Sequence, residues 1–169
     1  MWWRLAIIFL AIQGLAHGDE AYIWQRQWTP ELSKAVLAQR TLFSRYRVLG
    51  AQHVNGNQWA EPAIDLAALK AAAVPVVLVI RLPGAAPLLT AEQLATKIAE
   101  IRTRWLNAGV ASMRVEIDFD CAEAQLQRYR AQLVALRVLL PKGLFLDIDR
   151  KSTRLNSSHL DLSRMPSSA

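Results

Sequence analysis

Several residue types that build common active sites are scarce in this chain. Its 169 residues include one cysteine and three histidines. A lone cysteine, Cys121, excludes an internal disulfide, and we interpret it as a small residue buried at a strand end. Two histidines fall in terminal segments that are set aside below, which leaves only His53. A histidine-rich zinc site or a Ser-His-Asp triad therefore cannot be assembled here.

Glycine is scarce too, and its distribution argues against a dinucleotide-binding fold. No Gly-rich phosphate loop follows the first predicted strand, where a dinucleotide-binding fold would carry one. We predict no cofactor.

The N-terminus has the layout of a secretory signal peptide. Arg4 supplies a positive charge, Leu5–Ala16 is mostly apolar, and small residues follow at the cleavage position. The apolar run is short for a membrane span. We predict a signal peptide at residues 1–18 and bacterial export of the rest to the periplasm or outside the cell, without membrane contact after cleavage. An uncleaved membrane anchor is the alternative.

The C-terminal segment, residues 149–169, has a different origin in our interpretation. Back-translation of Asp149–His159 in one frame reproduces a common short-read sequencing adapter, and Ser163–Ala169 matches its continuation. A native, flexible, Ser-rich tail is the alternative. We predict a non-native, disordered tail and exclude it from fold reasoning. The native protein is then expected to continue past Ile148, and this truncated chain is expected to be inactive by itself.

The charge of the chain does not indicate a nucleic-acid partner. The formal net charge is +6, of which Arg4 and the tail contribute three. The remaining basic residues are scattered singly, without an arginine-rich run or an aromatic platform. We predict no nucleic-acid partner.

Residues 19–148 alternate between strand and helix patterns. The strand patterns lie at residues 21–27, 46–54, 74–82, 113–121 and 144–148, and the helix patterns at 29–43, 64–73, 90–107 and 122–140. Such units imply a parallel sheet with right-handed crossovers. A complete eight-fold barrel needs ~250 residues. We therefore predict an α/β fold, the N-terminal half of a (β/α)8 TIM-like barrel, in residues 19–148. An open doubly wound parallel sheet is the alternative.

The segment Val115–Cys121 alternates three carboxylates with apolar residues. Because successive side chains of a strand point to opposite faces, Glu116, Asp118 and Asp120 share one face. Three acids on one face repel each other unless water, cations or a substrate compensate them. Parallel α/β folds build their sites at the carboxyl ends of strands. We predict Glu116, Asp118 and Asp120 as candidate catalytic residues.

Aromatic and cationic residues are predicted at the same end of the sheet. Trp24 and Arg26 would point inward from the first strand, and Arg81 closes the third. His53 precedes a turn that could contact a substrate, although a plain turn explains it better. We predict that these four residues bind a carbohydrate or another polar small molecule.

Three segments resemble a secreted bacterial family, domain of unknown function 3142. They are Trp24–Thr29, Val77–Gly84 and Arg114–Cys121. The resemblance implies a barrel like those of glycoside hydrolases, with no settled substrate or catalytic residues. The acidic strand is also similar to that of chitinase-like glycosidases. However, Ala122 stands where their motif has a glutamate.

Three functional hypotheses follow. The first is a glycosidase, with Glu116 or Asp118 as general acid because neighbouring carboxylates favour its protonated form. The second is a sugar-binding or scaffold barrel without catalysis. The third is a structural network in which Arg26 and Arg81 neutralise the acids. A divalent metal on the acids is a minor alternative.

Overall fold

The computed structural model describes residues 19–56, 58–84, 89–119 and 121–148. The predicted signal peptide, Asp120 and the predicted adapter-derived tail lie outside the described residues. The elements in chain order are β1 (Asp19–Ile23), α1 (Pro30–Ala38), β2 (Phe43–Asn55), β3 (Gln58–Ala60), α2 (Leu66–Ala72), β4 (Val76–Leu82), α3 (Ala91–Asn107), β5 (Arg114–Phe119), the 3₁₀ helix η1 (Glu123–Gln125), α4 (Leu126–Leu139) and β6 (Phe145–Ile148).

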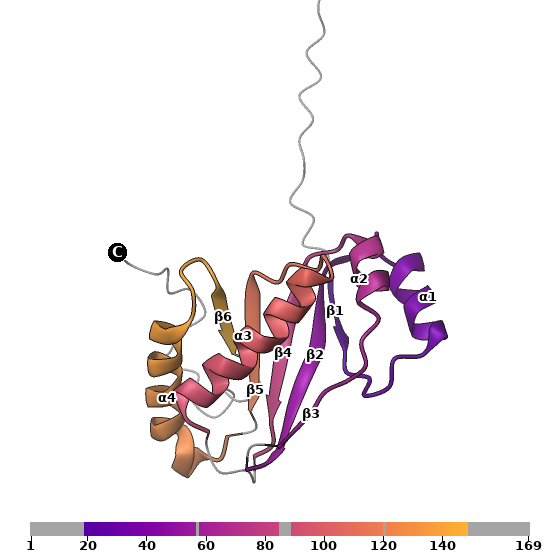
Figure 1. Ribbon diagram of the computed structural model, residues 1–169. Helices are drawn as coiled ribbons and strands as arrows, with labels where there is room; N and C mark the ends of the chain where they lie inside the picture. Colours follow the sequence, from indigo (N-terminus) through magenta and orange to yellow (C-terminus); the bar gives the residue numbers. More distant parts are fainter. Residues whose placement is uncertain (1–18, 57, 85–88, 120, 149–169) are drawn as a thin grey trace, which may run out of the picture.

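The strands follow one another across the sheet in the order β1-β2-β4-β5-β6, and each of these neighbours is parallel (Figure 1). β3 pairs antiparallel with β2 at the side. A doubly wound sheet would instead reverse its strand order at a switch point. The predicted α/β class is confirmed, and the sequential order is consistent with an open α/β sheet or a partial barrel.

N-cap residues mark the first turns of α3 and α1. The Thr90 side chain accepts a hydrogen bond from the Gln93 amide, and the Gln93 side chain bonds back to the Thr90 backbone, which forms a capping box. At α1, Thr29 is the N-cap and Pro30 the first helical residue. The predicted N-termini of both helices are therefore confirmed.

Several predicted boundaries need correction, and α4 begins at Leu126 rather than at residue 122 because a 3₁₀ turn precedes it. β1 lies at residues 19–23 rather than 21–27, and α1 ends at Ala38 rather than residue 43, because the residues from Phe43 onward pair with β1. β3 has no counterpart in the prediction. It forms because the chain turns back at Gly56, whose φ of +46° suits glycine, and pairs with the end of β2.

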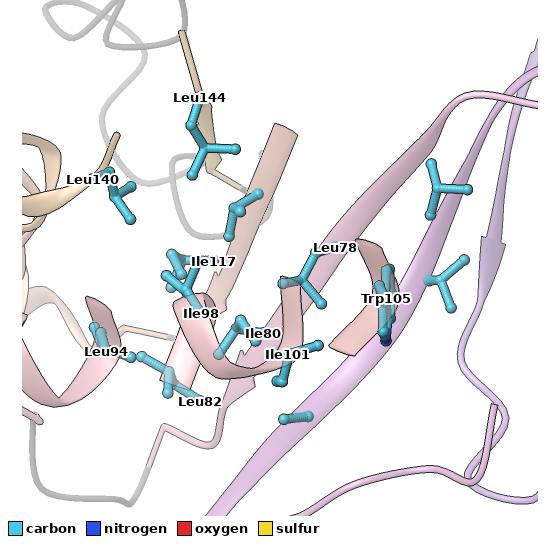
Figure 2. Packing of buried hydrophobic residues seen from close by; sticks show 14 of the residues in the cluster. Leu78, Ile80, Leu82, Leu94, Ile98, Ile101, Trp105, Ile117, Leu140 and Leu144 are labelled. Atoms are coloured by element: carbon cyan, nitrogen blue, oxygen red, sulfur yellow. The ribbon is translucent and has the colours of Figure 1, made fainter. Parts of the chain in front are cut away.

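One apolar cluster joins all four α-helices to alternate residues of the strands. Figure 2 shows Leu78 and Ile80 of β4 close to Ile101 of α3, with Ile117 of β5 nearby. The alternation in β5 is confirmed, because Val115, Ile117 and Phe119 all belong to this cluster. The helices thus cover one face of the sheet, and the other face carries Glu116 and Asp118.

Cys121 lies two residues beyond β5 and is buried, as interpreted from the sequence. Burial raises the pKa of its thiol, which makes it a poor nucleophile near neutral pH.

Within the described ranges, no helix is both long and apolar enough to cross a membrane.

Candidate functional site

Three side chains from neighbouring strands lie in register at the carboxyl edge of the sheet. Gln52 of β2 pairs with Arg81 of β4, and Arg81 pairs with Asp118 of β5. Parallel strands present their carboxyl ends at the same edge, so the three side chains form one row there. We call this row, together with Trp24 and Arg26, the rim.

The rim holds a buried carboxylate next to a cation. Asp118 is 5% exposed, and Arg81 Nη1 donates a hydrogen bond of 3.1 Å to its Oδ2. The Arg81 side chain is 37% exposed, so water reaches the guanidinium but scarcely reaches the carboxylate. The charge of Asp118 is thus compensated by a cation that remains partly solvated.

An indole ring completes the aromatic part of the rim. The Arg81 guanidinium carbon lies 5.4 Å from the centroid of the Trp24 ring, a cation–π distance. Trp24 also stacks on Tyr22, with ring centroids 5.5 Å apart and planes 4° apart. These contacts hold the indole in one orientation at the end of β1.

Arg26 joins the rim through an amide rather than a carboxylate. Its Nη2 donates a hydrogen bond of 2.9 Å to Gln52 Oε1. The structure therefore brings together Trp24, Arg26, Arg81 and Asp118, although they come from three separate strand ends.

Glu116 lies one layer deeper than Asp118, in register with Val79 on one side and Asp147 on the other. It is 1% exposed, forms an ion pair with Arg47, and accepts a hydrogen bond of 3.2 Å from the Tyr22 hydroxyl. These contacts stabilise the carboxylate. The expectation that neighbouring acids favour its protonated form overlooked this cation.

Arg47 is the centre of a buried ionic network. It pairs with Glu20 and Glu116, and its Nη1 lies 3.5 Å from Asp147 Oδ2. Burial alone would lower the pKa of Arg47, but the carboxylates of Glu116 and Glu20 outweigh it and raise the pKa. Arg114 adds a bidentate contact to Asp147, with N–O distances of 3.0 and 2.8 Å. The cation facing Glu116 is thus Arg47, which the sequence analysis did not identify.

Two contacts in this network cross several strands. Tyr22 of β1 reaches Glu116 of β5, and Arg47 of β2 reaches Asp147 of β6. Each pair is three strands apart in the sheet order, which corresponds to about 14 Å in a flat sheet. We infer that the sheet curves toward its polar face, as the wall of a barrel does.

His53 is not brought to the rim. It is fully buried, its Nε2 lies 2.8 Å from the Gly56 carbonyl oxygen, and the centroid of its ring lies 5.2 Å from that of Trp59, with the two planes at 66°. Because its neighbour Gln52 points to the rim, His53 points to the opposite face of the sheet. It orders the β2–β3 turn, which agrees with the plainer interpretation made from the sequence.

Asp120, the third predicted acid, lies outside the described residues. Among the residues that are described, no group of three His, Cys, Asp or Glu side chains is arranged to hold a metal ion.

Two residues on the polar face of the sheet, the face that carries Glu116 and Asp118, were not predicted, although the sequence around them has a recognisable pattern. In β2, Arg45 and Arg47 flank the buried Tyr46, and in β6, Asp147 lies between Leu146 and Ile148. This is the same polar–apolar alternation that identified the acids of β5. The pattern could have found Arg47 and Asp147, although not the partner of each.

No curated protein matches this chain. A crystal structure of the spore cortex-lytic enzyme SleL from Bacillus cereus is similar in fold, with a TM-score of 0.51 and 16% sequence identity over 78% of this chain. The chain spans 33% of the length of that enzyme. At this identity, the likeness shows the fold alone.

The profile of one family, a domain of unknown function (DUF3142), matches residues 72–165. The match includes β4, β5 and β6 and therefore the strands that carry Arg81, Asp118 and Asp147. It spans more than half of the sequence, so the chain belongs to the DUF3142 family.

Proposed function

We propose that the chain is the N-terminal part of an exported bacterial carbohydrate-active protein, a glycoside-hydrolase-like TIM barrel whose site is the rim. The observation that carries the proposal is the buried carboxylate of Asp118 at the end of β5, in contact with Arg81 beside the indole of Trp24. The sequential strand order and the likeness to a cortex-lytic enzyme support it.

The chemistry of glycoside hydrolysis explains why these residue types suit the rim. One carboxylic acid protonates the leaving oxygen, while a second carboxylate acts as nucleophile or base about 5–9.5 Å away. Asp118 is the favoured acid because it lies at the edge, whereas Glu116 is enclosed by Arg47 and Tyr22. The second carboxylate is Asp120 or a residue of the continuing chain. Trp24 would stack on a sugar face, which is apolar, and Arg81 would bind hydroxyl groups.

The test uses the product of the complete source gene and a broad panel of glycans. Asp118→Asn removes the acid with little change in shape, so hydrolysis should fall by at least about 100-fold. Glu100→Gln is the matched control, because it makes the same change on the exposed surface of α3. Cleavage that survives in Asp118→Asn would exclude Asp118 as the acid.

A sugar-binding barrel without catalysis is the second candidate, and one contact favours it. The ion pair with Arg81 stabilises the ionised form of Asp118, which cannot donate a proton. In this case the complete protein binds glycans and cleaves none of them, and Asp118→Asn weakens the binding. Product analysis by mass spectrometry separates the two candidates.

A further inference from the structure

We propose that the rim recognises an acidic saccharide, a sugar that carries a carboxylate, and that Arg26 binds this carboxylate. The inference rests on the proposed function, because it names the ligand class of the same site. It starts from how the arginines of the polar face are paired.

Most arginines of this face already contact a carboxylate of the protein. Arg45 pairs with Glu20, Arg47 with Glu20 and Glu116, and Arg114 with Asp147. Arg81 pairs with Asp118. Their charges are compensated within the fold, and an incoming anion would have to compete with these pairs.

Arg26 differs from these four arginines. Its hydrogen-bond partner is the neutral amide of Gln52, and within the described ranges it contacts no carboxylate. The residue is exposed at the carboxyl end of the sheet. The bond to Gln52 orients the guanidinium and leaves its charge and its other N–H groups for a ligand.

The surroundings of Arg26 fit a sugar acid rather than a free anion. Gln52 is the register neighbour of Arg81, which lies over the indole of Trp24, so the bond to Gln52 holds Arg26 on the Arg81 side of the rim. The partly exposed indole of Trp24, which would contact the sugar ring, and the guanidinium of Arg26, which would bind its carboxylate, are thus parts of one rim. Guanidinium and carboxylate groups form two parallel hydrogen bonds.

The experiment compares matched ligands on the complete gene product. The probes are hexuronic acid oligosaccharides of several linkages, each with its carboxyl-reduced counterpart, which keeps the ring and linkage but lacks the charge. Calorimetry should show at least about tenfold tighter binding of one acidic oligosaccharide than of its reduced form, a difference of about 1.4 kcal/mol. Added salt should weaken only the acidic ligand.

Three variants assign the preference to Arg26. Arg26→Gln should bring the two affinities together, and Arg26→Lys should restore part of the difference. Arg130→Gln, which removes the same charge from the exposed surface of α4, should keep the full preference. Thermal unfolding should be unchanged in Arg26→Gln, because the side chain is exposed.

The outcomes separate this inference from the proposed function. Equal binding of acidic and reduced oligosaccharides overturns the acidic ligand and leaves the carbohydrate site. An acidic preference that persists in Arg26→Gln overturns the role of Arg26. Absence of any saccharide binding overturns both the proposed function and the inference.

Discussion

Glu116 and Asp118 lie two residues apart on one face of β5, and their cations differ in exposure. Arg47, which faces Glu116, has a side chain that is 15% exposed, whereas that of Arg81, which faces Asp118, is 37% exposed. Removing a carboxylate is costly when its cation stays buried and cheap when water can solvate the cation. Under our proposal, this contrast distinguishes a structural acid, Glu116, from a functional one, Asp118.

We predict that Glu116→Ala destabilises the complete protein by about 3–5 kcal/mol, as expected for a broken buried ion pair. Asp118→Ala should cost only about 0–1 kcal/mol, because Arg81 turns to water. Urea unfolding of both variants measures the difference. If Asp118→Ala costs as much as Glu116→Ala, the hypothesis of a purely structural network replaces the proposed site.

A second residue-scale prediction concerns Asp65, the N-cap of α2. The Ala68 amide donates to its carboxylate at 2.9 Å and the Ser33 hydroxyl at 2.7 Å, and these bonds lower the pKa of Asp65. A lowered folded-state pKa stabilises the fold above the ordinary carboxyl pKa of about 3.9. This contribution disappears as the pH falls through the lowered value.

Asp65→Ala should therefore cost about 1 kcal/mol at neutral pH, the usual cost of a lost N-cap. The difference from the parent protein should shrink as the pH falls below about 4, because the unfolded chain takes up the proton there, and the charge contribution is lost once the pH passes below the lowered folded-state pKa. Denaturant titrations at several pH values measure it. A difference that is independent of pH would show that Asp65 acts without its charge.

At the scale of elements, the sequence predicted the strand–helix alternation because the apolar and polar residues repeat with clear periods. Strands β4 and β5 carry strong patterns, and Thr90 marks the start of α3. The short strand β3 was missed because three residues carry no period. Arg47 and Tyr22, the partners of Glu116, were not predicted, because contacts between side chains of separate strands depend on the register and curvature of the sheet.

The packing of α3 on β2 gives an element-scale prediction. Gly50 lies where the register between β2 and β4 shifts, and a Cβ there would overlap Leu78 and lie 3.3 Å from Trp105. Gly50→Ala should destabilise the protein by about 1–3 kcal/mol through overpacking. In the double variant with Leu78→Ala, the added methyl occupies vacated space, so the combined cost should be less than the sum. Additive costs in urea unfolding would contradict this contact.

For the whole molecule, the outer edge of β6, which pairs with no other strand among the described residues, and the outer surface of α4 bear on solubility. Exposed apolar residues lie there, namely Val134, Val138, Leu139 and Phe145. An open strand edge beside apolar side chains favours association. Expressed alone, Asp19–Ala169 should aggregate or remain molten, as seen by light scattering and near-UV circular dichroism. A soluble monomer with a sharp thermal transition would contradict the half-barrel proposal.

Two observations on the C-terminal segment point in different directions. The codon match predicts that residues 149–169 come from a sequencing adapter, whereas the family match continues to residue 165. A native segment would explain the family match, and an adapter would explain the codons. The genomic sequence decides between them.

The most direct measurement is therefore to amplify the source locus and sequence across the codon of Ile148 with different adapters. Our account predicts that the reading frame continues into further strand–helix units, which complete the barrel and supply inward-facing carboxylates near the rim. If the genomic frame instead encodes Asp149–Ala169 and then stops, the protein is a small open sheet. The adapter origin, the barrel and the glycoside-hydrolase proposal would then all be wrong.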